Sequence, residues 1–125
     1  MILGTGIDLV EISRIESSLG RHGERFLHRI LLPGEVAYCL SYAKPGPHVA
    51  ARFAAKEAVS KAFGTGIGAR LGWHDIEVIR QSSGEPIVML HAGGERLLVE
   101  RGARRIHLSL THTNGFAAAV AILEA

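Results

Sequence analysis

The strongest constraint on the fold is an alanine-rich segment, residues 48–63, which lies between Pro47 and the glycine-rich run Gly64-Thr65-Gly66-Ile67-Gly68. Six of its residues are alanine, which has the highest helix propensity of all residues. A proline before the segment and a glycine after it are typical helix boundaries. On a wheel that advances about 100° per residue, most of the alanines share one broad arc with Val59 and Phe63. Because alanine side chains let a neighbouring backbone approach closely, the segment predicts a buried central helix.

Residues 2–12 alternate in a way that predicts a strand. Larger side chains occupy its odd positions, whereas Gly4, Gly6 and Asp8 occupy the other face. A carboxylate in the middle of an apolar strand is costly to bury unless it is paired or binds a cation. Asp8 is therefore either half of a structural ion pair with an arginine or part of a functional site, and the strand alone leaves both interpretations open.

The remaining pattern predicts an α+β single domain that spans residues 1–125. A capping-box spacing predicts a helix that begins at Ser13 and ends near Gly20 or Gly23. Pro33 can occupy the first position of another helix, which runs to about Tyr42. The later elements are strands at 73–80 and 87–90 joined by a turn at 82–86, a helix at 94–101, and strands at 105–111 and 116–123 joined by a turn at 113–115.

Composition excludes several classes of protein. Hydrophobic residues make up 47% of the chain, which is enough for a core and argues against intrinsic disorder. The longest apolar run, residues 116–123, is far shorter than a membrane-spanning helix, and no basic residues precede the apolar N-terminus as they do in a signal peptide. A single cysteine, Cys39, excludes an internal disulfide and a multi-cysteine metal site. We expect a soluble, cytoplasmic protein.

The basic residues are unevenly distributed. Eleven of the 14 are arginine, whose planar fork suits carboxylate and phosphate groups. Residues 14–29, which we call the basic segment, contain four arginines and two histidines against two glutamates. The segment is either a docking surface for an acidic partner or an ordinary solvated face.

Glu57 and Lys61 lie four residues apart at the edge of the apolar arc of the long helix. The simplest interpretation is a surface ion pair one turn apart. Alternatively, Asp8 and Glu57 are two hard carboxylate ligands that suit Mg²⁺ completed by substrate phosphate and water, and Lys61 neutralises the same phosphate. Spacing in the sequence does not bring Asp8 near Glu57, so the trio is a hypothesis at this point.

Two further motifs are weaker. The glycine-rich run 64–68 follows a helix instead of preceding one, and it lacks the spacing of a phosphate-binding loop. His112 stands at the end of the predicted strand 105–111, where it can contact a phosphate or simply complete the turn. The other histidines are scattered without metal-ligand spacing, and no Ser-His-Asp arrangement is evident.

Three stretches together resemble one family over the whole chain, the holo-[acyl-carrier-protein] synthases, which form the short branch of the 4′-phosphopantetheinyl transferase superfamily. The stretches are Gly4-Thr5-Gly6-Ile7-Asp8-Leu9-Val10-Glu11-Ile12 with Arg14-Ile15, Arg52-Phe53-Ala54-Ala55-Lys56-Glu57-Ala58 through Ser60-Lys61-Ala62-Phe63-Gly64-Thr65-Gly66-Ile67-Gly68, and Ser109-Leu110-Thr111-His112-Thr113. The resemblance implies one domain of that fold, with a long central helix packed on antiparallel strands.

The resemblance also implies an activity. Such enzymes move the phosphopantetheine arm of coenzyme A to a serine of an apo acyl carrier protein and release adenosine 3′,5′-bisphosphate, a step that serves fatty acid biosynthesis and other lipid metabolism. Asp8 and Glu57 would hold Mg²⁺ on the pyrophosphate of coenzyme A, and Lys61 would stabilise charge on the reacting phosphate. Glu57, or a water on the metal, would take the proton from the serine hydroxyl.

The resemblance assigns binding residues as well. Lys44 would approach the 3′-phosphate of coenzyme A and Pro86 its nucleotide, and the rest of the nucleotide and phosphate end would be lined by Arg52, Ser60, Gly64, Thr65, Gly66, His112 and Thr113. Arg14, Arg21 and Arg25 would dock the acidic helix of the carrier protein, with Phe26 as an apolar contact. Members of this branch assemble as homotrimers with active sites between subunits. Two departures from the family pattern are a sparse basic run around Lys44 and Asn114 in a place where an acid is frequent.

Two other functional classes compete with this interpretation. One is a non-catalytic partner of acidic proteins on the same fold, against which the intact Asp8, Glu57 and Lys61 argue. The other is a small basic nucleic-acid binder, which is disfavoured because the arginines lack interleaved aromatic residues and the net charge is only +2.

Overall fold

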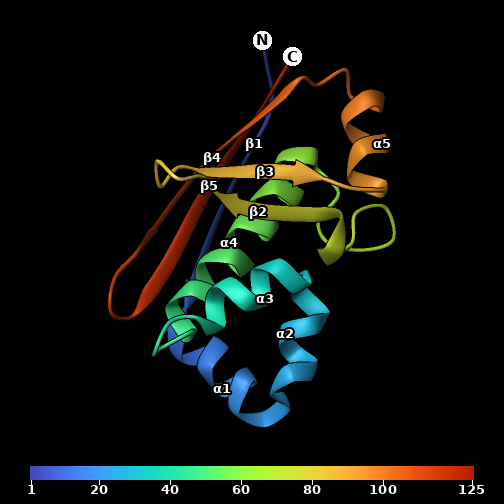
Figure 1. Cartoon of the computed structure of the whole chain (residues 1–125). Coiled ribbons are helices and arrows are strands. Elements are labelled where there is room, and N and C mark those ends of the chain that lie inside the picture. The colour runs from blue at the N-terminus through green and yellow to red at the C-terminus, as the bar shows by residue number, and fades with distance from the viewer.

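The computed structural model describes residues 1–125 and has the predicted α+β class (Figure 1). The elements in chain order are β1 Ile2–Glu11, α1 Ile12–His22, α2 Glu24–Ile30, α3 Pro33–Leu40, α4 Gly46–Phe63, the 3₁₀ turn η1 Trp73–Asp75, β2 Ile76–Arg80, β3 Pro86–Leu90, α5 Gly93–Glu100, β4 Arg105–His112 and β5 Phe116–Glu124. One antiparallel sheet has the strand order β1-β5-β4, and β2 and β3 form a separate hairpin.

Helix α4 is the centre of the molecule, as the alanine-rich segment predicts. It crosses between the three-stranded sheet and the β2–β3 hairpin, while α1, α2 and α3 gather around its N-terminal half (Figure 1). Both hydrophobic clusters of the core include α4 residues, one packed against the strands and the other against the three short helices. The helix ends at Gly64, whose φ of 80° is a conformation that glycine adopts without strain.

The glycine face of β1 lies directly on α4. A Cβ atom on Gly6 would be 1.8 Å from the carbonyl oxygen of Ala58, and one on Gly4 would be 2.0 Å from that of Ala62. Neither glycine can therefore be replaced without moving the strand or the helix. The two glycines and the small residues of α4 together allow the backbones of β1 and α4 to touch.

The opposite face of β1 is open to solvent. Ile7 and Leu9 are 69% and 65% exposed, and on the neighbouring strand Phe116 and Val120 are also exposed. We call these four side chains the outer apolar patch of the sheet. Isolated exposed hydrophobic residues are common, whereas a contiguous group is typical of interaction surfaces. No helix is both long and apolar enough to cross a membrane.

A buried ion pair fixes the short helices to α4. The ammonium group of Lys56 donates to Glu35 Oε1 at 2.7 Å and to the carbonyl oxygens of Ile30 and Trp73 at 2.7 and 3.1 Å. Glu35 also accepts hydrogen bonds from the backbone N–H groups of Leu32 and Val78. Burial lowers the pKa of Lys56, although the charge of Glu35 opposes that shift. Every strong donor and acceptor here has a partner, as a buried pair requires.

The structure corrects several details of the sequence prediction. Helix α1 begins at Ile12, with Glu11 as an N-cap that makes no side-chain bond, so the predicted capping box at Ser13 does not form. The separate helix α2 was not predicted, and the predicted strand 73–80 begins as the turn η1. Helix α3 ends at Leu40, two residues earlier than expected. These errors lie at element boundaries and leave the fold class unchanged.

The contact between β1 and α4 predicts the effect of a single methyl group. We expect Gly6→Ala to lower the free energy of unfolding by about 1–3 kcal/mol, the usual cost of overpacking a core, because its Cβ would overlap the Ala58 carbonyl. Gly20→Ala is the matched control, since Gly20 lies within α1 with no atom near its added Cβ. In urea unfolding, the free energy of unfolding of Gly20→Ala should be unchanged or raised by up to about 1 kcal/mol. Equal stabilities for the two variants would contradict the argument.

Candidate active site

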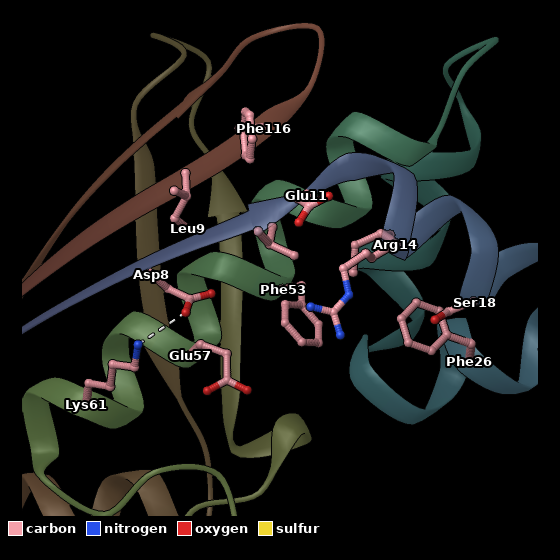
Figure 2. Close-up of a pocket in the computed structure, with 12 residues that line it drawn as sticks. Asp8, Leu9, Glu11, Arg14, Ser18, Phe26, Phe53, Glu57, Lys61 and Phe116 are labelled. Atoms are coloured by element: carbon pink, nitrogen blue, oxygen red, sulfur yellow. Dashed lines mark hydrogen bonds and ion pairs between the residues drawn. The ribbon is translucent and has the colours of Figure 1, made fainter.

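Asp8, Glu57 and Lys61 lie together where β1 crosses α4 (Figure 2). The Lys61 ammonium is 3.2 Å from Asp8 Oδ1 and donates to the Ile7 carbonyl oxygen at 2.9 Å. Asp8 is thus paired with a lysine and not with an arginine. The protein's ion pairs include Lys61 with Asp8 but not Lys61 with Glu57, so the simple surface pair along the helix does not form. The structure brings together the three residues that spacing alone could not connect.

Glu57 is held in a setting that disfavours its charge. Partial burial raises the pKa of its carboxyl above the usual value, and the negative charge of Asp8 raises the pKa further, while Lys61 lowers it. Two carboxylates therefore face one ammonium group. The cluster carries one negative charge more than it can neutralise.

This imbalance fits a divalent cation. Two carboxylates are the protein ligands that Mg²⁺ takes when substrate phosphates and water complete its shell. Asp8 and Glu57 line the same cavity, so they are the candidates for the protein's share of such a site. Their oxygen donors suit a hard cation and not a soft one.

A cavity of about 540 Å³ opens beside the trio and extends to the short helices. Arg14, Ser18 and Phe26 line its far side from α1 and α2, and Phe53 lies between them and Glu57 (Figure 2). Arg14 and Phe26 were expected to dock a partner. Both line the cavity that contains the candidate catalytic residues. Sequence analysis missed Phe53, although residues 53, 57 and 61 follow one another at intervals of four along one helix face.

The rest of the basic segment surrounds a second, smaller hollow. Arg25 and Phe26 line it together with His22 and Arg29, and its volume is about 180 Å³. Phe26 lines both hollows, so the two lie on either side of this side chain. Arg21 is exposed on α1 and lines neither of them.

A second group of expected binding residues lies on the opposite side of α4. Arg52 and Pro86 share a small pocket of about 100 Å³ with residues of β2 and β4, and none of its lining residues belongs to the larger cavity. Arg52 precedes Glu57 by five residues and Lys61 by nine, so at about 100° per residue their side chains point about 140–180° apart. Within one chain, helix α4 therefore lies between the residues expected to bind the nucleotide and the residues expected to be catalytic.

Other expected residues are engaged within the protein. Ser60 is buried and its hydroxyl donates to the Glu57 carbonyl oxygen at 2.7 Å. The N–H groups of Thr65 and Gly66 both donate to the Ser60 carbonyl oxygen, and the N–H of Gly64 donates to Lys61. The loop amides thus end the helix, and in this arrangement they are not available to a phosphate.

Three expected residues remain near the start of α4. Lys44 is exposed in the loop before α4, and His112 is exposed at the end of β4, where its ring lies 6.1 Å from that of His48. The Thr113 hydroxyl accepts hydrogen bonds from the N–H groups of Gly115 and Phe116, and so forms the β4–β5 turn. Of this group, Lys44 and His112 are free to meet a ligand.

Comparison with known proteins identifies the family of this chain. A family model described as the 4′-phosphopantetheinyl transferase superfamily matches residues 4–121. The chain belongs to that superfamily. It is 50% identical to the holo-[acyl-carrier-protein] synthase of Koribacter versatilis, over 99% of both chains.

The chain is also similar to two crystal structures of holo-[acyl-carrier-protein] synthases. The enzyme from Neisseria meningitidis has a TM-score of 0.93 and 34% identity, with 100% of both chains covered. The enzyme from Helicobacter pylori, in complex with coenzyme A, has a TM-score of 0.86 and 33% identity, with 96% of this chain and 99% of that chain covered.

Within the superfamily, this phosphopantetheinyl transferase belongs with the holo-[acyl-carrier-protein] synthases, which it matches over nearly its whole length. The resemblance carried by its three sequence stretches is thereby confirmed, as are its fold and its class of enzyme. The role of each site residue remains a prediction.

The pKa of Glu57 provides a test of the site before any substrate is added. Because the folded state raises this pKa, the folded protein retains the Glu57 proton at pH values where the unfolded chain has lost it. Ionisation of Glu57 therefore lowers the free energy of unfolding as the pH rises from the Glu57 pKa of the unfolded chain to the Glu57 pKa of the folded protein. We expect Asp8→Asn to lower the Glu57 pKa, measured by ¹³C NMR of its carboxyl, and to narrow that pH window.

Glu95→Gln is the control, because it removes an exposed negative charge on α5. The Glu57 pKa should not move in this variant. A pKa that is the same in Asp8→Asn as in the unmodified protein would contradict the proximity of the two carboxylates.

Proposed function

We propose that this chain, as one transferase domain over residues 1–125, transfers the phosphopantetheine arm of coenzyme A to a serine of an apo acyl carrier protein in the cytoplasm. The products are the holo carrier protein and adenosine 3′,5′-bisphosphate, and the reaction requires Mg²⁺ and serves fatty acid biosynthesis. The observation that carries the proposal is the cluster of Asp8, Glu57 and Lys61 at the edge of an open cavity lined by Arg14 and Phe26. Similar proteins are named holo-[acyl-carrier-protein] synthases, which supports the same activity for this chain.

The chemistry is a displacement at phosphorus. The serine oxygen forms a bond to the phosphorus that carries the pantetheine arm, and the bond from that phosphorus to the bridging oxygen of the diphosphate breaks. Glu57, or a water that it orients, accepts the serine proton. Its raised pKa makes it a stronger base than an ordinary glutamate. Lys61 stabilises the charge that develops on the departing phosphate.

Asp8 and Glu57 are the residues that would hold Mg²⁺. The cation, when bound, neutralises the diphosphate and acts as a Lewis acid toward its oxygens. The chain's own contribution is to hold the two carboxylates in one cavity. Lys61 fixes Asp8 in place, because its ammonium contacts Asp8 and the β1 backbone at once.

The basic segment supplies the docking surface for the carrier protein. Arg14 lines the catalytic cavity, while Arg25 and Phe26 continue the surface along α2, and Arg21 extends it on α1. An acidic helix laid along this surface would put the serine before it at the cavity mouth. Charge complementarity of this kind raises association rates and falls with ionic strength.

We further propose a homotrimer in which each active site combines two subunits. Two observations support it. The outer apolar patch of Ile7, Leu9, Phe116 and Val120 is exposed in a single chain, and the Arg52 pocket shares no residue with the cavity that contains Glu57. Contact through the patch would remove apolar surface from water, and it would also let the nucleotide residues of one chain face the carboxylates of another.

The transfer itself is tested by incubating the protein with coenzyme A, Mg²⁺ and an apo acyl carrier protein, and weighing the carrier by intact mass spectrometry. We expect a mass gain of one phosphopantetheine arm together with adenosine 3′,5′-bisphosphate, and loss of both with a chelator. Glu57→Gln should reduce kcat by about 10²–10⁴-fold, as expected for loss of a general base. Lys61→Met should reduce kcat by about 10²–10³-fold.

Glu95 is exposed on α5 and does not line the catalytic cavity, so Glu95→Gln should retain full activity. Transfer that continues in the presence of a chelator would overturn the role of the metal. Coenzyme A binding without transfer would instead point to the wrong carrier protein.

Mixing two inactive variants tests the shared site. Glu57→Gln and Arg52→Met chains are each expected to be inactive as pure oligomers. In a 1:1 mixed trimer about a quarter of the sites would combine an intact Glu57 with an intact Arg52 from the neighbouring chain. Recovery of about a quarter of the unmodified rate after co-expression is therefore expected. Failure to recover any activity would show that both residues act within one chain.

A further inference from the structure

Two basic side chains donate hydrogen bonds to the backbone of β1. Lys61, in the last turn of α4, donates to the Ile7 carbonyl oxygen at 2.9 Å. Arg101, which follows α5 and lies 98 residues further along the chain than Leu3, donates from Nη2 to the Leu3 carbonyl oxygen at 3.3 Å. The glycines of β1 permit a close approach to α4 but have no side chains that bond to it. The polar side-chain contacts that hold the strand backbone therefore come from these two cations.

Arg101 also bonds to the end of α4. Its Nη1 donates to the carbonyl oxygen of Phe63, the last residue of the helix. The final carbonyl groups of a helix have no partner within the helix, and a cation beside them meets the negative end of the helix dipole. N–H groups of the loop after α4 bond to the Ser60 and Lys61 carbonyl oxygens. Arg101 supplies the corresponding partner for Phe63.

The two carbonyl groups that Arg101 joins are next to one of the closest backbone contacts in the protein. Leu3 precedes Gly4 in β1, and Phe63 follows Ala62 in α4. A Cβ atom on Gly4 would lie 2.0 Å from the Ala62 carbonyl oxygen. Arg101 therefore joins strand and helix beside this contact, and it does not line the cavity that contains the carboxylates.

The end of α5 is itself fixed in place. The Arg101 N–H donates to the carbonyl oxygen of Leu97, which is buried in the core. The preceding residue, Glu100, accepts two hydrogen bonds from Arg70 Nη2 at 2.9 and 2.8 Å. Both members of this pair are more than half exposed, and neither side chain bonds to β1 or α4. The guanidinium of Arg101 thus extends from a fixed point toward the strand and the helix.

The position of β1 determines where the Lys61 ammonium points. An ammonium group has three N–H donors, and two of them are used on the Ile7 carbonyl oxygen and Asp8 Oδ1. The third is the donor left for a phosphate. Because both existing partners belong to β1, a shift of the strand along the helix would move Asp8 and redirect the third donor together. Whatever fixes the strand therefore also fixes these two side chains.

We propose that Arg101 is a positioning residue for the transfer reaction. It holds the beginning of β1 on the last turn of α4, and thereby sets the positions of Asp8 and Lys61 without touching the substrate. The planar guanidinium suits this task, because its separate N–H groups reach two carbonyl oxygens at once. The inference rests on the proposed function, since it concerns residues that act in that reaction.

Steady-state kinetics provide the first test. Arg101→Met is expected to lower kcat by about 10–100-fold, the scale for a small displacement of catalytic groups, and to leave KM for coenzyme A nearly unchanged. Arg101→Lys, which keeps the cation, should recover part of the loss. Arg70→Met is the matched control, because it removes one exposed positive charge at the same end of α5 and should retain kcat. A kcat for Arg101→Met equal to that of the control would overturn the proposal.

Val36→Ala separates positioning from stability. Val36 is buried in α3, so the loss of two methyl groups should lower the thermal midpoint by a few degrees. Assayed well below its midpoint, this variant should keep its kcat, whereas Arg101→Met should not. Equal losses of kcat in the two variants would assign Arg101 a merely structural role and overturn the proposal.

A double-mutant cycle tests whether Arg101 acts through Lys61. The effects of two residues in one unit are not additive. Arg101→Met should therefore lower kcat by about twofold at most in a Lys61→Met background, far less than in the unmodified protein. A loss of the same size in both backgrounds would contradict the proposed route.

Amide hydrogen exchange tests the same contact without substrate or metal. Arg101→Met should speed exchange of the Gly64, Thr65 and Gly66 N–H groups by about 10-fold or more, as local opening of the helix end requires, and Arg70→Met should not. Unchanged exchange would overturn the role of Arg101. Faster exchange in a protein that transfers no phosphopantetheine would instead support that contact and count against the proposed function, so the two failures are distinguishable.

Discussion

The close contact between the backbones of β1 and α4 is the constraint on which the rest of the structure depends. Gly4 and Gly6 lie against the carbonyl groups of Ala62 and Ala58, so close that an added Cβ atom would overlap the carbonyl oxygen. This contact brings the strand within reach of the helix side chains, so Asp8 meets Lys61 one turn beyond Ala58. It also turns the larger side chains of β1 outward. The carboxylate site and the exposed apolar patch are thus two consequences of one packing arrangement.

Helix α4 carries two buried basic side chains, one in an ion pair and one without an acidic partner. Lys56 is fully paired, and through Glu35 it fixes α2, α3 and β2 to the helix. Arg52, one turn earlier, has only an aromatic ring beneath it. The difference is physical: a buried pair contributes order and little net energy, while an unpaired cation is kept at a cost to stability. Such a cost is expected where a ligand, and not the fold, completes the interaction.

Much of this architecture is visible in the sequence, because helix propensity and strand alternation act locally. The C-terminal limit of α4 and the two faces of β1 follow from composition and period alone, whereas α4 begins at Gly46, two residues before the predicted start. Helix α2 was missed because Gly23, with φ of 55°, ends one helix and begins the next within a basic stretch that has no clear period. The proximity of Asp8 and Glu57 depends on how a strand packs across a helix, which no local pattern encodes. The contacts of Tyr38 with Arg52 and Arg80 likewise arise only from tertiary packing.

The separation of the two halves of the site within one chain has the same origin as the exposed patch. Arg52 and Glu57 point to opposite sides of α4 because five residues turn a helix by about 140°. A ligand that needs both must either bend around the helix or bind where two copies meet. The outer apolar patch favours the second arrangement, because its members Leu9 and Phe116 also line the cavity that contains the carboxylates. Any subunit that covers those side chains also approaches the carboxylates, so assembly and completion of the site would be a single event.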